Sequence, residues 1–168
     1  MKHFLIILLV SISITLKAQI HANVEKILNV PVYMYSYPTS DFEEIKTFGA
    51  FFSELSSSLG GETSVNDIVK EIINKAKNQQ KKGKVDEFDA IIINPDDYSG
   101  ILIELSDNTN LRSEVIKVLN VPVFMYSYPV DEFEEVDEYE ATLSFLVGES
   151  SLSERTKEIV KKAKRRQE

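Results

Sequence analysis

The sequence of 168 residues contains no cysteine and no tryptophan, and it has only two histidines, His3 and His21. Without cysteine, the chain cannot form disulfides, thiolate nucleophiles or cysteine-ligated zinc sites. Two histidines, one of them at the extreme N-terminus, are too few for a histidine-based transition-metal site. We therefore predict that the protein holds neither a metal nor a cofactor.

Positive charge is also scarce, with 19 lysines and arginines against 27 aspartates and glutamates. Nucleic-acid binding depends on many basic contacts to phosphates, so the sequence predicts no nucleic-acid partner. Phosphate-cradling motifs are absent too, because Gly60-Gly61 is followed by glutamate and no lysine. The carboxylates stand in exposed-looking runs without the contrasting environments that acid and base catalysis requires. The prediction is that the protein is not an enzyme.

Residues 1–18 have the layout of a signal peptide. A basic start at residues 1–3 precedes an uncharged, mostly apolar run at residues 4–16, and Ala18 then stands before a polar residue. The apolar run is shorter than the roughly 20 residues of a membrane-spanning helix. We therefore predict cleavage after Ala18, a periplasmic or secreted protein, and no stable membrane span afterwards. The alternative is that Val10-Ser-Ile-Ser-Ile14 forms a strand.

A ten-residue segment occurs twice in the chain. Asn29–Pro38 and Asn120–Pro129 lie 91 positions apart and differ only in that Tyr33 is replaced by Phe124. Such a match indicates a tandem duplication, and each copy is small enough to favour two copies packed together. The predicted organisation is a signal peptide at 1–18, a first repeat at 20–106 and an incomplete second repeat at 111–168.

A helix is the clearest prediction in the first copy. Its apolar residues recur at helical spacing and are Val65, Ile68, Val69, Ile72, Ile73 and Ala76. Thr63 or Ser64 can cap the free amides at its start, and Asp67 suits the positive end of the helix dipole. Burying these side chains contributes on the order of 10 kcal/mol, which is no more than the cost of ordering the segment. The helix therefore needs a sheet to pack on.

Strands are predicted on both sides of this helix, from runs of β-branched and aromatic residues. They span residues 32–37, 42–52, 88–93 and 100–105, with the first two paired antiparallel and the last two joined by the turn Asn94–Ser99. Val24–Leu28 is left open as a short helix or a strand. The sequence thus predicts an α+β fold of β-β-α-β-β-like repeats, in which one helix packs on an antiparallel sheet.

The second copy ends early. Its helix is predicted at 152–164, and Glu168 corresponds to Lys81, so the last two strands have no counterpart. Apolar side chains of that helix then lose much of their cover. Three explanations stay open: a reading frame that continues past Glu168, a sheet shared with the first copy, or strands supplied by residues 4–16. Such an uncovered face would also promote a homodimer.

Carboxylates are plentiful enough to consider a hard cation such as calcium. They occur in two runs, at Asp41, Glu43 and Glu44 and at Asp131, Glu132, Glu134, Glu135, Asp137, Glu138 and Glu140. Runs of this kind on a strand and its turn usually face water. Asn94, Asp96 and Gly100 resemble the opening of a calcium loop, but Leu105 stands where the bidentate glutamate belongs. A hairpin turn is predicted there instead.

Six aromatic residues form the predicted interaction surface. They are Tyr33, Tyr35 and Tyr37 in the first copy and Phe124, Tyr126 and Tyr128 in the second. On a continuous strand they alternate with residues such as Val32 and Met34, so that the aromatic rings share one face. Such a stripe suits a sugar or a peptide. The alternative is cross-strand packing with the hydroxyls at the rim.

The order of the predicted elements is similar to that of known bacterial proteins. A strand pair, a capped helix ending in Lys-Ala-Lys, the segment Phe88-Asp-Ala-Ile-Ile-Ile93 and a final alternating strand resemble the small exported modules of the YdgH/BhsA group and, more distantly, of the YbjQ-like group. The Gly-Ala pair that those families carry after the helix is replaced by Phe88-Asp89-Ala90, so no site residue is transferred. The resemblance implies an envelope protein.

Taken together, these features predict an exported, non-catalytic envelope or secreted module that binds a protein or a small ligand. The alternative is a binder of a small ligand or a divalent cation through the acidic strand-turn segments. No catalytic, cofactor-binding or metal-ligating residue is assigned.

Overall fold

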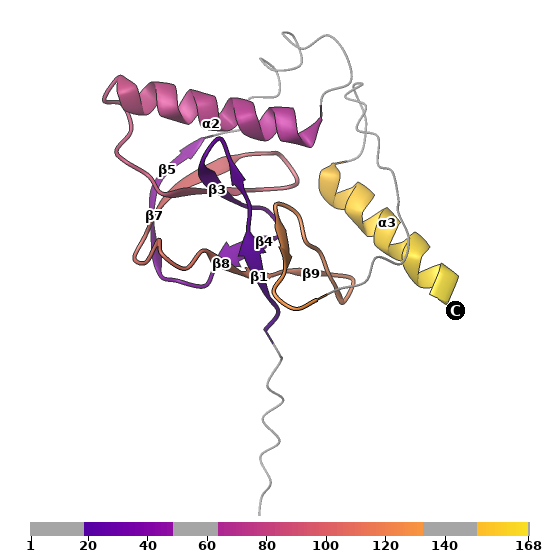
Figure 1. The fold of residues 1–168 in the computed structure, drawn as a ribbon. Coiled ribbons are helices and arrows are strands. Elements are labelled where there is room, and N and C mark those ends of the chain that lie inside the picture. Colours follow the sequence, from indigo (N-terminus) through magenta and orange to yellow (C-terminus); the bar gives the residue numbers. More distant parts are fainter. Residues whose placement is uncertain (1–18, 49–63, 133–150, 168) are drawn as a thin grey trace, which may run out of the picture.

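The computed structural model describes residues 19–48, 64–132 and 151–167, which form an α+β protein (Figure 1). In chain order the elements are β1 (His21–Val24), β2 (Lys26–Ile27), β3 (Val30–Tyr33), β4 (Ser36–Pro38), β5 (Phe42–Phe48), α2 (Val65–Lys81), β6 (Ala90–Ile93), β7 (Gly100–Leu105), β8 (Arg112–Val115), β9 (Lys117–Val118), β10 (Val121–Pro122), β11 (Ser127–Pro129) and α3 (Leu152–Gln167). The predicted signal peptide and the alternative strand within it lie outside the described residues.

One layer of the molecule is a five-stranded sheet with the order β2-β3-β6-β7-β5. β6 and β7 form an antiparallel hairpin, which confirms the two strands and the turn predicted for this part of the chain. β3, however, pairs with β6 in parallel, with Val32 opposite Ile91. The prediction of a purely antiparallel sheet is therefore wrong. α2 lies between β3 and β6 in the sequence, and a crossover through a helix brings the chain back parallel.

The strand predicted at 32–37 is in fact two strands. Tyr35 has a φ of 55°, which lies in the left-handed region and interrupts an extended strand. β3 therefore ends at Tyr33, and β4 begins at Ser36 in a different sheet. The segment 24–28, which the sequence left open, contains the end of β1, the strand β2 and the first residue of a turn.

The partner of β5 also differs from the prediction. β5 pairs antiparallel with β7, with Phe42 opposite Leu105 and Phe48 opposite Gly100, and it does not form a hairpin with the first strand. The physical reason is that β4, which precedes β5, is engaged in the other sheet, whereas β7 offers a free edge. Residues 49–52 of the predicted strand lie outside the described residues.

The helix α2 lies across the five-stranded sheet, as Figure 1 shows along the top of the molecule. It begins at the predicted position, where Ser64 Oγ accepts a hydrogen bond from the backbone N–H of Asp67 at 3.1 Å. The predicted apolar face is confirmed, because its buried residues are Ile68, Val69, Ile72, Ile73 and Ala76. They pack in one cluster with side chains of the sheet such as Val32, Ile91 and Leu102. Burial of each large apolar side chain contributes roughly 1.5–3 kcal/mol to the stability of the fold.

A second apolar cluster lies on the other face of this sheet. It consists of Tyr33, Ala90, Ile92, Ile103 and Leu105, with Val24, Ile101 and Leu111 packed against it. Val24 is the last residue of β1, and Leu111 immediately precedes β8; both strands belong to a second sheet. The molecule is therefore layered, with α2 on one side of the five-stranded sheet and the second sheet on the other.

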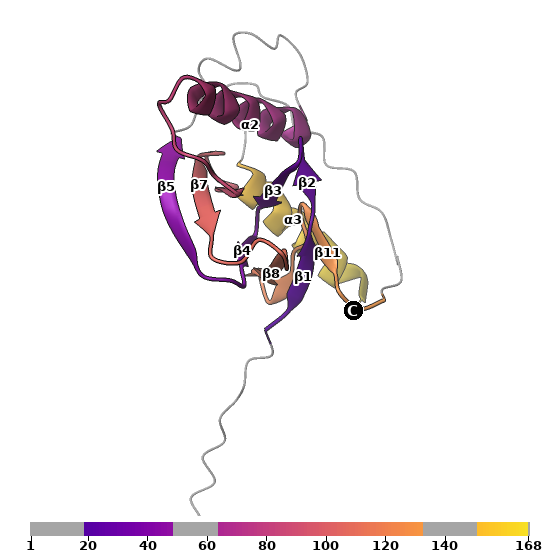
Figure 2. The same cartoon turned by 60° about the vertical axis from the view of Figure 1, so that its left-hand side comes forward.

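The second sheet has four strands in the order β11-β1-β8-β4, so each half of the chain alternates with the other. β1 pairs antiparallel with β11 on one side and with β8 on the other (Figure 2). β8 in turn pairs with β4. The four-stranded sheet therefore takes strands from both 20–106 and 111–168, whereas all five strands of the other sheet lie within 20–106.

Several equivalent positions of the two halves have the same backbone conformation. We call two positions counterparts when they are 91 apart in the strands or 87 apart in the helices. Six of the seven left-handed non-glycine residues described occur in counterpart pairs, with φ values of 50° and 51° at Leu28 and Leu119, 64° and 67° at Asn29 and Asn120, and 55° and 54° at Tyr35 and Tyr126; the seventh is Tyr98. Ala22 lies directly opposite its own counterpart Ser113, and Met34 opposite Met125. The shared sheet is thus built around an approximate two-fold axis.

Each helix is joined to the hairpin of its own half through a lysine. Leu28 and Asn29 form the two-residue turn between β2 and β3, and two positive φ values are the requirement of a type I′ hairpin. Lys77 Nζ donates to the carbonyl oxygen of Leu28 at 2.6 Å. The counterpart Lys164 Nζ donates to the carbonyl oxygen of Leu119 at 2.7 Å. This hydrogen bond stabilises a turn in which the left-handed conformation of leucine costs about 1–2 kcal/mol.

The helix predicted at 152–164 is confirmed as α3, which lies beside β9 (Figure 1). Leu152 is buried in the same cluster as the apolar face of α2, and Val160 is also buried. Ile159 and Ala163 are only half-buried, although their counterparts Ile72 and Ala76 are buried. The start of α3 is therefore covered by the first half of the chain, and its later turns are covered less.

Ser113 provides a test of the packing on the two-fold axis. Its side chain is fully buried, and among the described residues its hydroxyl has no hydrogen-bond partner. Because the counterpart is Ala22, an alanine already fits this environment. Ser113→Ala should leave the free energy of unfolding unchanged or raise it by up to about 1 kcal/mol, measured by urea denaturation. Ala22→Ser, the matched control, should lower it by roughly 1–3 kcal/mol, and the opposite order would contradict this packing.

Candidate functional site

The six aromatic residues predicted to form one surface do not share a face. Tyr33 and Tyr35 are buried, Phe124 and Tyr126 are half-buried, and Tyr37 and Tyr128 are 52% and 47% exposed. The prediction of a continuous stripe is wrong, because the left-handed conformation at Tyr35 and Tyr126 ends the alternation of side chains. The structure brings only the last member of each set to the surface.

The left-handed tyrosines are held by reciprocal contacts between the two halves. The backbone N–H of Glu25 donates to the carbonyl oxygen of Tyr126 at 2.8 Å, and that of Ile116 donates to the carbonyl oxygen of Tyr35 at 2.8 Å. The Tyr35 hydroxyl also donates to Thr156 Oγ1 on α3 at 3.2 Å. These bonds offset a backbone strain of about 1–2 kcal/mol per residue. They also fix the direction in which the chain continues from these tyrosines into β4 and β11, and thereby the positions of Tyr37 and Tyr128.

Tyr37 and Tyr128 lie on the same outer face of the four-stranded sheet. Tyr128 is opposite Asn23, which is opposite Arg112, and Tyr37 is opposite Glu114, which is opposite His21. Residues that are paired across antiparallel strands point to the same side of the sheet. We name this surface the tyrosine face, formed by His21, Asn23, Tyr37, Arg112, Glu114 and Tyr128.

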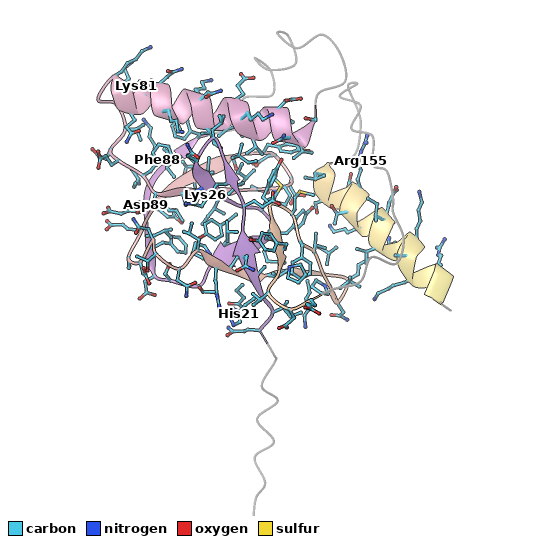
Figure 3. The ribbon with its side chains drawn as sticks, viewed as in Figure 1. His21, Lys26, Lys81, Phe88, Asp89 and Arg155 are labelled. Carbon is cyan, nitrogen blue, oxygen red and sulfur yellow. The ribbon has the colours of Figure 1, made fainter. Side chains whose placement is uncertain are left out.

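The tyrosine face is open to solvent and lies away from α2. His21, Arg112 and Glu114 are exposed, and Asn23 is half-exposed. Figure 3 shows His21 at the lower end of β1, on the side of the molecule opposite α2. The residues between them in sequence, Ala22 and Ser113, are fully buried and point inward. The alternation of the strands thus separates an apolar inner face from a polar outer face.

The geometry of this face suits an extended polar ligand. β11 and β4 are the outer strands, so the two tyrosines are separated by three strand spacings, or about 14 Å across the sheet. Between them lie an amide, a guanidinium, a carboxylate and an imidazole, which supply hydrogen-bond donors and acceptors. Tyrosine rings offer a flat apolar surface with a polar hydroxyl at the rim. The face can therefore stack on a ligand at two points and bond to it in between.

Sequence reasoning did not find the polar part of this face. His21 and Glu114 are far apart in the chain and come together only through the pairing of β1 with β8. A local signal did exist, since exposed and buried residues alternate along both of these short strands. It could not show which strands are neighbours.

Two acidic segments, at 41–44 and 131–140, were candidates for cation binding. Asp41, Glu43 and Glu44 are exposed around the start of β5, and Glu43 lies opposite another carboxylate, Glu104. Asp131 and Glu132 are exposed, while the later acids of that run lie outside the described residues. In the part of the chain that is described, no group of three or more histidines or carboxylates is arranged to hold a metal ion.

The turn between β6 and β7 uses its polar side chains internally. Asn94 Oδ1 accepts from the backbone N–H of Asp96 at 2.9 Å, and Asp97 Oδ1 accepts from that of Ser99 at 2.8 Å. The backbone N–H of Asn94 donates to the carbonyl oxygen of Ser99 at 2.9 Å. The hairpin turn predicted in preference to a calcium loop is confirmed.

A group of buried and half-buried tyrosines lies around the starts of α2 and α3. Burial raises the pKa of Tyr98 to about 12, and also that of Tyr126 to about 12. It raises the pKa of Tyr35 as well, although the hydrogen bond to Thr156 opposes this effect. Tyr33, in the second apolar cluster, also has its pKa raised by burial to about 12. None of these phenols is suited to ionise near neutral pH.

These buried phenols make a pH-dependence measurable. In the unfolded chain a tyrosine ionises near pH 10, whereas burial raises the pKa of Tyr126 in the folded chain to about 12. Stability from this group is therefore complete below about pH 10 and is lost as the pH rises toward about 12, because only the unfolded chain releases the proton there. The urea midpoint should fall over this range, and Tyr126→Phe should make the fall less steep. If the urea midpoint falls equally steeply with pH in both proteins, the partial burial of Tyr126 is contradicted.

Among the described residues, no helix is both long and apolar enough to cross a membrane. Comparison with known proteins identifies no relative of this chain: no family model, no curated protein and no solved structure matches it.

Proposed function

We propose that the protein is an exported, non-catalytic binding module of the bacterial envelope or of the secreted space, and that it binds its ligand on the tyrosine face. The observation that carries this proposal is the exposure of Tyr37 and Tyr128, at 52% and 47%, on one face of one sheet. Tyrosine is enriched at protein interfaces, because its ring offers apolar area and its hydroxyl can form a hydrogen bond.

The ligand class follows from the shape and polarity of the face. A flat sheet surface with aromatic rings at its two edges favours an extended polar polymer, namely a peptide segment or a glycan. The polar residues between the rings include charges of both signs, at Arg112 and Glu114, so the face selects neither an anionic nor a cationic polymer by charge alone.

A non-catalytic role is supported by the surroundings of the titratable residues. His21 and Glu114 are both exposed on an open sheet face, where water surrounds them. Acid and base catalysis relies on enclosed groups whose environments push their pKa values apart. The strongly shifted phenols are buried on the other side of the sheet, away from any ligand on the tyrosine face.

Export rests on the layout of residues 1–18, a basic start followed by a short apolar run and a small residue. When the full chain is produced in a bacterium and fractionated, the protein should appear in the periplasm or the medium. Mass spectrometry should give an N-terminus at Gln19. A full-length chain that stays in the cytoplasm would contradict the proposal of export.

Binding on the tyrosine face can be tested with a double variant. Tyr37→Ser combined with Tyr128→Ser should lower binding to cell-envelope fragments, or to peptides and soluble cell-wall glycans, at least ~10-fold, because exposed aromatic anchors carry most of the energy of such interfaces. Binding can be measured by cosedimentation and by NMR chemical-shift mapping. The matched control is Leu28→Ser with Leu119→Ser, a counterpart pair of similar exposure that lies outside the face.

The proposal fails if the tyrosine variant binds as well as the unmodified protein while remaining folded. It also fails if the shifts caused by the best ligand lie away from β1, β4, β8 and β11.

A further inference from the structure

The two counterpart strands β3 and β10 have different surroundings. β3 lies between β2 and β6, and all four of its residues are buried. β10 pairs only with β9, and in the described part of the chain no strand lies along its other edge. Among the described residues, the backbone groups on that edge have no strand partner and can pair with an added strand, except that Pro122 has no N–H.

The side chains along this edge are correspondingly less covered than their counterparts. Val32, Tyr33 and Met34 are at most 1% exposed, whereas Val123, Phe124 and Met125 are half-buried. The same difference appears on the helices, as described above for Ile159 and Ala163 against Ile72 and Ala76. We name this surface the β10 edge, formed by Val121, Val123 and Phe124 together with Ile159 and Ala163 of α3.

The first half of the chain shows what kind of element covers such a surface. There the cover is the β6–β7 hairpin, whose first strand, Ala90–Ile93, is buried at every residue. It adds in parallel to β3, with Val32 opposite Ile91 and Tyr33 opposite Ile92. The left-handed residues that flank β3 have the same φ values as their counterparts around β10, so an added apolar strand would meet a similar chain path at Val123 and Phe124, the counterparts of the residues that pair with β6.

The charges around the β10 edge favour a partner with acidic residues. α3 exposes five cations, at Lys157, Lys161, Lys162, Lys164 and Arg165, against two exposed carboxylates at Glu154 and Glu158. The segment that leads into β6 contains acids at Asp86, Glu87 and Asp89. A partner strand with a similar acidic lead would meet opposite charges on α3.

The same charges disfavour a second copy of this chain as the occupant. Two molecules joined through their β10 edges would bring one basic α3 near the other, which is a repulsive arrangement. A second copy also has no spare hairpin to offer, since β6 and β7 already occupy the centre of its own five-stranded sheet.

We propose that the β10 edge is a docking site for a strand of another polypeptide, namely an apolar strand of about four residues with an acidic lead, which adds to β10 in parallel as β6 adds to β3. Strand addition of this kind is an established mode of peptide recognition, in which main-chain bonds supply affinity and side-chain pockets supply specificity. The site is separate from the tyrosine face, which belongs to the other sheet.

The first test uses a labelled peptide with the sequence of residues 82–106, which carries the acidic lead and both strands of the hairpin. It should bind the full chain saturably, and fluorescence anisotropy measures the binding. Phe124→Ser should weaken binding at least ~10-fold, because a large apolar contact is lost. Tyr128→Ser, the matched control on the tyrosine face, should leave it unchanged. Binding that is absent, or equal for both variants, overturns the proposal.

The second test keeps the proposal falsifiable if Phe124→Ser fails to fold. A copy of residues 82–106 is fused after Glu168, the counterpart of Lys81, just as Lys82 follows Lys81 as the C-cap of α2. The melting temperature should rise by roughly 5 °C or more, and exchange of the Phe124 amide, whose counterpart Tyr33 pairs with β6, should slow at least ~10-fold. The control is a fusion in which the copies of Ile91 and Ile93 are replaced by asparagine. It should neither raise the melting temperature nor slow the amide exchange.

Equal melting temperatures for the two fusions overturn the proposal. So does a dimer of the unmodified chain, shown by sedimentation, in which the Phe124 amide is already protected from exchange, because a second copy then occupies the edge.

Discussion

Antiparallel pairing between β1 and β8 places Ala22 opposite Ser113 at the centre of a sheet to which both halves of the chain contribute. From this contact the rest of the arrangement follows: β11 adds beside β1, β4 adds beside β8, and neither half contains the sheet alone. The small size of the two central side chains matters, because both are completely buried between the sheets. The tyrosine face exists only because the strands interleave, since each of its rows takes residues from both halves.

The interleaving depends on two left-handed residues that are neither glycine nor asparagine. Tyr35 and Tyr126 turn the chain out of one sheet and into the other, and each gives its carbonyl oxygen to a backbone N–H of the opposite half. The strain at each residue is thus compensated by a contact that only the complete fold provides. The same change of direction leaves Tyr35 buried and Tyr126 half-buried, and the next tyrosine of each set is exposed.

Both proposed interactions occur where the two halves differ. On the tyrosine face His21 has Arg112 as its counterpart and Asn23 has Glu114, so a symmetric backbone carries an asymmetric set of polar groups. At the edges, β3 is completed by β6, whereas β10 has no such neighbour among the described residues. Similar local structure therefore presents one closed surface and one surface open to a partner.

The sequence by itself determined the local elements. The capped, amphipathic helix α2 and the hairpin of β6 and β7 were predictable because their signals, periodic apolar residues, a serine cap and a run of turn residues, act between neighbours in the chain. The equivalence of the segments at Asn29 and Asn120 was also visible as repeated letters. Only the tertiary structure decided that β3 is parallel to β6, that β5 pairs with β7, and that strands of the two halves alternate. These pairings depend on long-range hydrogen bonds and on positive φ angles at tyrosines, and side-chain type alone encodes neither.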